Sequence, residues 1–288
     1  MSVHLKNFIN VTRLNKPIGF LLLFWPCSWG LSLANYFQKD INAFIYYLIL
    51  FFLGSVFMRS AGCIVNDIVD EKIDKKVLRT KKRPIASGSL SKKLAWTYVL
   101  MLCALAFIVL IQFNLLTIFL GIFSMIFAFS YPFMKRFTYW PQLFLGFTFN
   151  WGIIMAWTSI TNEISYLPIL LYIGAIFWTL GYDTIYGIQD ISDDEVIGVK
   201  STAIKFKDNL GLFVGSCYSI SSIIIVFVMT NIKINFSSIF LLFFILSLFY
   251  QIKICKNKKP SECLKAFKLN NLSGMLVFLS FFLINIKI

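Results

Sequence analysis

Long apolar runs, separated by short polar segments, are the main pattern along this chain. Most of these runs reach about 18 residues or more, the length at which a helix crosses the hydrocarbon core of a bilayer. The predicted helices cover residues 17–37, 41–65, 94–111, 114–134, 141–160, 166–189, 209–230, 236–254 and 271–286. The pattern therefore predicts an all-α, polytopic membrane protein with nine transmembrane helices, forming a single integral membrane domain over residues 1–288.

The distribution of basic residues gives these helices an orientation. If the N-terminus lies inside, 23 of the 27 Lys and Arg residues fall in inner segments or, for Lys253, at the inner end of a predicted helix, and only Lys39, Lys233 and Lys287 in outer ones. The remaining basic residue, Arg59, lies within the second predicted helix. Because inner loops of membrane proteins carry an excess of Lys and Arg, this asymmetry predicts an N-in, C-out topology.

The composition is that of a membrane protein and argues against a nucleic-acid-binding protein. The chain is 58% hydrophobic and 14% charged, with a formal net charge of +14. Basic residues of membrane proteins set topology and attract anionic headgroups, and no nucleic-acid-binding pattern accompanies them, so no nucleic-acid partner is expected. The six cysteines are dispersed and are interpreted as small core residues. Residues 1–16 lack a signal-peptide pattern, so the first apolar run is expected to be a retained helix.

Acidic residues are concentrated in two stretches, at the inner ends of the second and sixth predicted helices. Asp70 and Asp74 are four residues apart, and so are Asp190 and Asp194, which places each pair on one face of a continuing helix. Clustered carboxylates near a membrane boundary repel one another unless cations neutralise them. Oxygen ligands of this kind suit Mg²⁺, whereas the single histidine, His4, argues against zinc. Nine of the 13 acids belong to these stretches: Asp67, Asp70, Glu71, Asp74, Asp183, Asp190, Asp193, Asp194 and Glu195.

Basic residues close to both clusters suggest a phosphorylated ligand. Arg79 and Arg83 follow the first cluster, and Lys135 and Arg136 end the fourth predicted helix. Arginine offers forked donors for the oxygens of a diphosphate that metal ions leave free. Most neighbouring lysines are interpreted as topogenic charges instead.

Arg59 is unusual because it lies inside an apolar helix, where an ionisable residue is a functional hypothesis by default. It either pairs with an Asp of the same site or holds the carboxylate of an acidic acceptor. Asp183 lies about two turns deeper than Asp190 and is expected to face a cavity or a partner group. Tyr186 lies between these two residues on the same predicted helix.

Around these positions the sequence resembles the UbiA prenyltransferase family, in its 4-hydroxybenzoate polyprenyltransferase branch. The resemblance runs through most of the chain, and the motif positions show no departure from the pattern. The motifs that carry it are Arg13-Leu14-Asn15-Lys16-Pro17, Trp25-Pro26, Arg59-Ser60-Ala61-Gly62-Cys63, Asn66-Asp67-x-x-Asp70-x-x-x-Asp74, Arg79-Thr80-x-x-Arg83-Pro84, Tyr131-Pro132-x-x-Lys135-Arg136 and Tyr182-Asp183-Thr184-Ile185-Tyr186-Gly187-Ile188-Gln189-Asp190.

The resemblance implies helices around a central cavity that opens sideways to lipid. It implies transfer of a polyprenyl group from polyprenyl diphosphate to the carbon ortho to the hydroxyl of 4-hydroxybenzoate, in ubiquinone biosynthesis. It also implies a bacterial inner membrane, a cytoplasmic active site and no obligate protein partner. The implied ligands of Mg²⁺ are Asp67, Asp70, Asp74, Asp190 and Asp194, with Asn66. The implied substrate-binding residues are Arg59, Arg79, Arg83, Lys135 and Arg136. Asp183 and Tyr186 are implied to line the reacting centre.

Three alternatives are weighed against this interpretation. Another aromatic acceptor, such as homogentisate or a naphthoate, or haem as in a sister branch, is disfavoured by Arg59 and by the stretch from Tyr182 to Asp190. A CDP-alcohol phosphotransferase is disfavoured because its motif is missing. A membrane cation transporter would need acids along a path across the bilayer, and here only Asp183 lies deep. Prenyl chain length is expected to depend on the depth of the cavity.

Overall fold

The structure, a computed structural model, describes residues 3–285 as an all-helical bundle. Within this part of the chain, nine helical segments are long and apolar enough to cross a membrane, which confirms the predicted architecture. Polar residues end the predicted runs as expected; for example, Asn114 caps the helix that follows the third span, accepting a 2.9 Å hydrogen bond from Thr117 N–H. The spans are α2 (Ile18–Gln38), α3 (Ile41–Val69), α5 (Lys92–Leu110), α6 (Leu115–Phe137), the pair α7 (Pro141–Asn150) and α8 (Gly152–Thr161), α9 (Tyr166–Gly187) with η1 (Ile188–Asp190) and α10 (Ile191–Ile197), α12 (Leu210–Thr230), η2 (Phe236–Ser238) with α13 (Ile239–Ile254) and η3 (Cys255–Asn257), and α14 (Pro260–Leu283).

Several helix boundaries differ from the sequence prediction, and two of them bear on the site. The last helix, predicted to begin at residue 271, begins at Pro260, and its predicted end at residue 286 lies outside the described residues. Lys265 and Lys268 interrupt the apolar pattern there, yet they are exposed while Ala266 on the same helix is buried, so the helix is amphipathic rather than broken. The second predicted helix continues past residue 65 to Val69, which brings the first acidic cluster onto its end.

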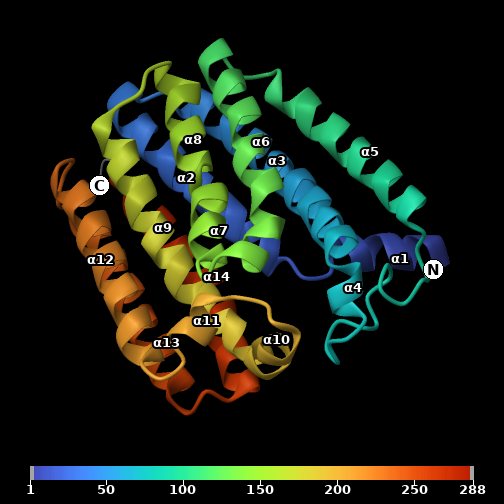
Figure 1. Cartoon of the computed structure of the whole chain (residues 1–288). Coiled ribbons are helices and arrows are strands. Elements are labelled where there is room, and N and C mark those ends of the chain that lie inside the picture. The colour runs from blue at the N-terminus through green and yellow to red at the C-terminus, as the bar shows by residue number, and fades with distance from the viewer. Residues whose placement is uncertain (1–2, 286–288) are drawn as a thin grey trace.

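The spans pack mainly in pairs. α9 packs on α12, α2 on α8, α3 on α5 and α13 on α14, and the colours of Figure 1 show that segments far apart in sequence meet in the bundle. The largest core cluster includes the fully buried Trp29 and Trp178, whose rings are 5.0 Å apart. α2 and α8 approach closely at Gly30, where any Cβ would overlap the backbone of α8. This packing fixes the helices that carry the acidic clusters.

A buried polar network ties four helices together. The indole N–H of Trp178 on α9 donates to Asn270 Oδ1 on α14 at 2.8 Å. Asn270 Nδ2 donates at 2.8 Å to Gln251 Oε1 on α13, which also accepts from the Tyr218 hydroxyl of α12 at 2.7 Å. Polar groups in an apolar interior stay buried only when they are hydrogen-bonded. The network therefore fixes the register of α9 against its neighbours.

Short helices gather at one end of the bundle, beside the ends of α3 and α9 that carry the acids (Figure 1). They are α1 (Val3–Thr12), α4 (Glu71–Asp74), α10 and α11 (Thr202–Lys205). This end is the polar face on which the candidate site is built.

Candidate functional site

The first acidic cluster forms where α3 ends and α4 begins. The backbone N–H of Asp70 bonds to Asn66 O at 2.9 Å, and that of Asp74 bonds to Asp70 O at 2.8 Å, so the helical spacing persists across the junction. Arg83, in the loop after α4, lies between two carboxylates, with Nη1 3.1 Å from Asp67 Oδ1 and 2.8 Å from Asp74 Oδ2. The side chains of Asp67, Asp70 and Asp74 are all buried, and Asp67 is only 1% exposed. The Arg83 guanidinium thus reduces the repulsion between the two carboxylates it contacts.

The second acidic cluster forms at the end of α9, and the same loop reaches it. Arg79 binds Asp190 with a two-pronged ion pair, Nε to Oδ1 at 2.7 Å and Nη2 to Oδ2 at 2.6 Å. Its third nitrogen donates to the Tyr186 hydroxyl at 3.3 Å. Lys135, at the end of α6, forms an ion pair with Asp70. Residues distant in sequence therefore join the two clusters through charge pairs.

A single cavity of about 1600 Å³ lies inside this frame, with both clusters on its wall. Of the predicted site residues, Arg136 alone does not line it. Arg136 is exposed and donates to Val69 O at 3.0 Å, because adjacent residues on a helix point to different faces and Lys135 takes the inward one. The lining positions are Arg59, Asn66, Asp67, Asp70, Asp74, Arg79, Arg83, Lys135, Asp183, Tyr186, Asp190 and Asp194.

Arg59 lies in the apolar part of the cavity. It forms no ion pair with any residue from 3 to 285, and its buried Nε has no hydrogen-bond partner. The guanidinium lies 5.3 Å from the centre of the Phe149 ring and packs against Gly19, where a Cβ would lie 2.9 Å from Nε. Of the two roles predicted for Arg59, pairing with an Asp is thus not seen, and the guanidinium remains available to a ligand.

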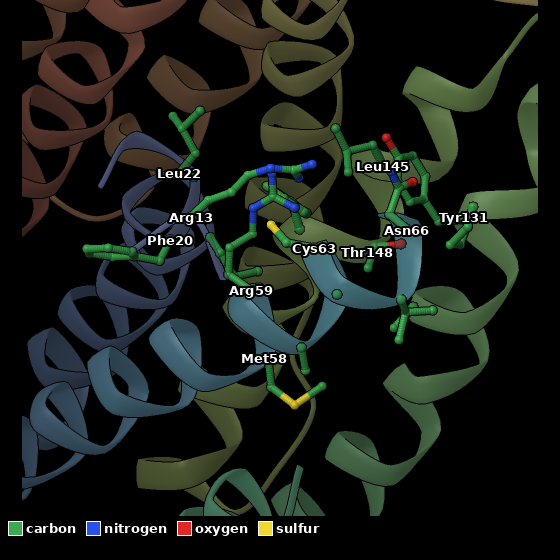
Figure 2. Close-up of a pocket in the computed structure, with 18 of the residues that line it drawn as sticks. Arg13, Phe20, Leu22, Met58, Arg59, Cys63, Asn66, Tyr131, Leu145 and Thr148 are labelled. Atoms are coloured by element: carbon green, nitrogen blue, oxygen red, sulfur yellow. The ribbon is translucent and has the colours of Figure 1, made fainter. Parts of the chain in front are cut away.

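Arg13 is the residue that sequence reasoning missed. It follows α1 with a left-handed φ of 56°, which turns its side chain toward Asp67, 2.5 Å from Nη2. Figure 2 shows the guanidinium groups of Arg13 and Arg59 reaching into the same space beside Cys63. The only sequence signal for it was its place in the first family-like motif. Arg13 is already paired with Asp67, so the cation in this space that can favour a further anionic ligand is Arg59.

Asp183 and Tyr186 line the cavity from α9. Within the described residues no hydrogen bond holds the Asp183 carboxylate, although the positive charge of Arg59 acts on it. The Tyr186 ring packs on Phe267 with centroids 4.6 Å apart, and its hydroxyl contacts Arg79. Both side chains are therefore positioned between the polar end and the apolar part of the cavity.

The electrostatics of the first cluster depend on its cations. Burial raises the pKa of Asp70, against the lowering effect of Lys135. Hydrogen bonds from Lys75 and Lys92 lower the pKa of the partly buried Glu71 to about 2. Burial thus favours the neutral carboxyl of Asp70, and the neighbouring Lys135 favours its ionised form.

The donor set fits Mg²⁺ rather than a metal held by protein alone. In the part of the chain that the structure describes, no three acidic, His or Cys side chains converge tightly enough to form a metal site. However, Asp70 Oδ1 is buried without a partner, which leaves a carboxylate oxygen unused. Mg²⁺ binds through one or two carboxylates together with water and substrate phosphates, so carboxylates spread along one cavity wall satisfy its preference.

Comparison with known proteins agrees with the resemblance seen in the motifs. The chain is 39% identical over 284 residues to a 4-hydroxybenzoate octaprenyltransferase of Vibrio atlanticus, covering 98% of this chain and 99% of that protein. It is 41% identical over 280 residues to the protein of that name from Blochmanniella pennsylvanica, covering 95% and 93%.

The fold is also shared with solved structures. A UbiA homolog from Aeropyrum pernix K1 matches with a TM-score of 0.73 at 22% identity, covering 90% of this chain and 94% of that one. A UbiA homolog from Archaeoglobus fulgidus bound to GPP and Mg²⁺ matches with a TM-score of 0.70 at 16% identity, covering 97% and 100%. Residues 23–279 match the model of the UbiA prenyltransferase family, and the chain is a multi-pass membrane protein that belongs to this family.

Proposed function

We propose that this protein transfers a polyprenyl group from polyprenyl diphosphate to the ring carbon ortho to the hydroxyl of 4-hydroxybenzoate, as a step of ubiquinone biosynthesis. The observation that carries the proposal is the combination of groups in one cavity. Paired carboxylates and basic residues lie at its polar end, and the unpaired Arg59 lies in its apolar part. Such a cavity suits a donor with a charged head and a long apolar tail, and a small acidic acceptor. The named relatives act on these substrates by their printed names.

The polar end is assigned to the diphosphate. Asp67, Asp70, Asp74, Asp190 and Asp194, with Asn66 beside them, would hold Mg²⁺, which supplies Lewis-acid stabilisation of the leaving diphosphate. Arg79, Arg83 and Lys135 already lie at these carboxylates and would donate to the remaining phosphate oxygens. The bond between the allylic carbon and the diphosphate oxygen then breaks, and its electron pair leaves with the diphosphate.

The apolar part is assigned to the acceptor. Arg59 would bind the carboxylate of 4-hydroxybenzoate and so point the phenol ring toward the allylic carbon. The ring carbon ortho to the hydroxyl forms the new carbon–carbon bond and loses its proton. The Asp183 carboxylate, held by no hydrogen bond from residues 3–285, would receive that proton beside Tyr186. The apolar walls exclude the water that would otherwise quench the allylic cation.

The membrane side of the site is part of the same proposal. The excess of Lys and Arg in the segments next to both clusters supports a cytoplasmic site in a bacterial inner membrane. No obligate protein partner is needed, because one chain supplies every group named above. Arg136 does not line the cavity and donates to Val69 O instead, so no contact with a substrate is assigned to it.

An acceptor panel tests the proposed substrate. Purified protein in detergent micelles is given octaprenyl diphosphate, Mg²⁺ and equal amounts of 4-hydroxybenzoate, homogentisate and 1,4-dihydroxy-2-naphthoate, and the products are separated by mass spectrometry. We expect prenylated 4-hydroxybenzoate to dominate. A dominant product from either of the other acceptors would overturn the acceptor while leaving the reaction class in place.

A further inference from the structure

Gln142 is a buried polar residue that lines the cavity. It is the second residue of α7, directly after Pro141, and its side chain is only 6% exposed. An amide side chain has an oxygen that accepts hydrogen bonds and a nitrogen with two N–H donors, and buried groups of this kind are normally hydrogen-bonded. The direction in which each half of the amide points therefore indicates what it binds.

The oxygen of the Gln142 amide is held by the protein. The backbone N–H of Thr202, the first residue of α11, donates to Gln142 Oε1 at 3.0 Å. The Thr202 hydroxyl lies 2.6 Å from the hydroxyl of Thr184 on α9, which donates to Leu180 O. Because a backbone N–H can only donate, the amide oxygen faces Thr202 and the amide nitrogen points away from it. Groups on α7, α9 and α11 thus set the orientation of the amide.

The nitrogen of the amide lies beside the segment of α9 that leads into the second acidic cluster. A Cβ added at Gly187 would lie 3.5 Å from Gln142 Nε2, and Gly187 lies between Tyr186 and Asp190 in sequence. All three of these α9 and η1 residues line the same cavity as Gln142. No residue from 3 to 285 accepts a hydrogen bond from Nε2. Two N–H donors therefore remain unused beside the end of α9.

Gln142 is also joined to the residue that serves the first acidic cluster from α6. The backbone N–H of Lys200, two residues before Thr202, donates to Lys135 O at 2.9 Å. The Lys135 ammonium forms the ion pair with Asp70, and Lys135, Lys200 and Gln142 all line the cavity. Gln142 is thus anchored near the end of α6, which reaches the first cluster, and near the end of α9, which carries the second.

We propose that the Gln142 amide nitrogen donates a hydrogen bond to a diphosphate oxygen of the donor, which makes Gln142 a further substrate-binding residue. The inference rests on the proposed function, which assigns the polar end of the cavity to the diphosphate. Basic residues at this end are already paired with carboxylates, Arg79 with Asp190 and Lys135 with Asp70, whereas Nε2 has no partner among the described residues. A neutral donor of fixed orientation is therefore available to the diphosphate without the loss of an ion pair.

The test removes the donor of the amide and keeps its acceptor. Gln142→Glu retains an oxygen for the Thr202 N–H but presents a carboxylate oxygen where the N–H donors were. The assay is run at about pH 8, far above the ordinary glutamate pKa of about 4.3, so that this oxygen repels the diphosphate. The apparent KM for octaprenyl diphosphate and the Ki for inorganic pyrophosphate, both in Mg²⁺, should each rise about tenfold or more, the factor expected from loss of a hydrogen bond to a charged group. The KM for 4-hydroxybenzoate should change less than about twofold.

Gln112→Glu is the matched control, because Gln112 is exposed in the turn after α5 and does not line the cavity, and all three constants should match wild type. If Gln142→Glu does not fold, Gln142→Met takes its place, with the same preferential loss for octaprenyl diphosphate and pyrophosphate. An unchanged constant for either of these two ligands, or equal losses for donor and acceptor, would overturn the hydrogen bond from Gln142. Wild-type protein that forms no prenylated 4-hydroxybenzoate would overturn the proposed function instead.

Discussion

Replacing Arg59 by methionine is expected to weaken binding of the acceptor while leaving the donor largely unaffected. Methionine keeps an unbranched apolar side chain but removes the guanidinium, which lies against Gly19 and Phe149. Since Arg59 forms no ion pair with the described residues, the change leaves no ion-paired carboxylate of the protein without its partner. The folded protein should therefore tolerate it, and the loss should appear in binding.

The magnitude follows from the hydrogen bonds that would be lost. A hydrogen bond to a charged group contributes about 1.5–3 kcal/mol. Taking about 2 kcal/mol for a carboxylate held by Arg59 in a cavity that is open on one side, the apparent KM for 4-hydroxybenzoate should rise about thirtyfold. The KM for polyprenyl diphosphate should change less than about threefold, because the nearest assigned metal ligand on α3, Asp67, lies eight residues, about 12 Å along the helix, from Arg59.

The sharpest assay compares 4-hydroxybenzoate with its neutral amide, 4-hydroxybenzamide. Wild type should prefer the acid, and Arg59→Met should lose most of that preference in kcat/KM, which general damage to the site would not do. Lys265→Met, at an exposed position outside the cavity, is the matched control. Equal losses for acid and amide, or an equal rise in KM for both substrates, would refute the assignment of Arg59.

Three further changes test how the frame is held. Arg83→Ala removes the cation that bridges the buried Asp67 and Asp74 and leaves only Arg13 on Asp67, so thermal unfolding in chelator should show a loss of about 1–3 kcal/mol that Mg²⁺ reduces; an equal loss with Mg²⁺ would contradict this pairing. Gly30→Ala should lower Tm through about 1–3 kcal/mol of overlap with α8, and an unchanged Tm would disprove the close approach. Asn270→Ala leaves buried partners unsatisfied and should cost about 1–3 kcal/mol in the same assay, whereas a Tm equal to wild type would show that the network contributes little.

Hydrophobic length was sufficient to predict the spans, because a bilayer imposes one length on every crossing helix. Hydrophobic length did not predict the start of α14, where Lys265 and Lys268 lie on the exposed face of a helix that begins at Pro260. Averaged hydrophobicity does not distinguish such an amphipathic extension from a loop. The end of α3 was placed short of Val69 for a different reason: Asn66 and Asp67 lower the local hydrophobicity, although Asp67 is buried and paired with Arg13 and Arg83.

The members of the site were predictable from charge, but their pairing was not. Acids at the ends of two predicted helices indicated one polar region, and the structure places them on one cavity. Which cation meets which carboxylate depends on loop geometry, as in Arg79 crossing to Asp190 and Arg13 turning to Asp67 through its left-handed backbone. No local pattern contains that information. The catalytic and metal-binding roles of these residues remain predictions.

The central claim is that this cavity performs metal-dependent prenyl transfer, and the most direct measurement is product formation with and without the metal. Purified protein that unfolds cooperatively is incubated with octaprenyl diphosphate and 4-hydroxybenzoate, either in Mg²⁺ or in excess chelator, and both released diphosphate and aromatic product are measured. We predict equal amounts of diphosphate and prenylated 4-hydroxybenzoate with Mg²⁺ and neither with chelator. Folded protein that forms no prenylated product in Mg²⁺, or forms it equally in chelator, would contradict the account.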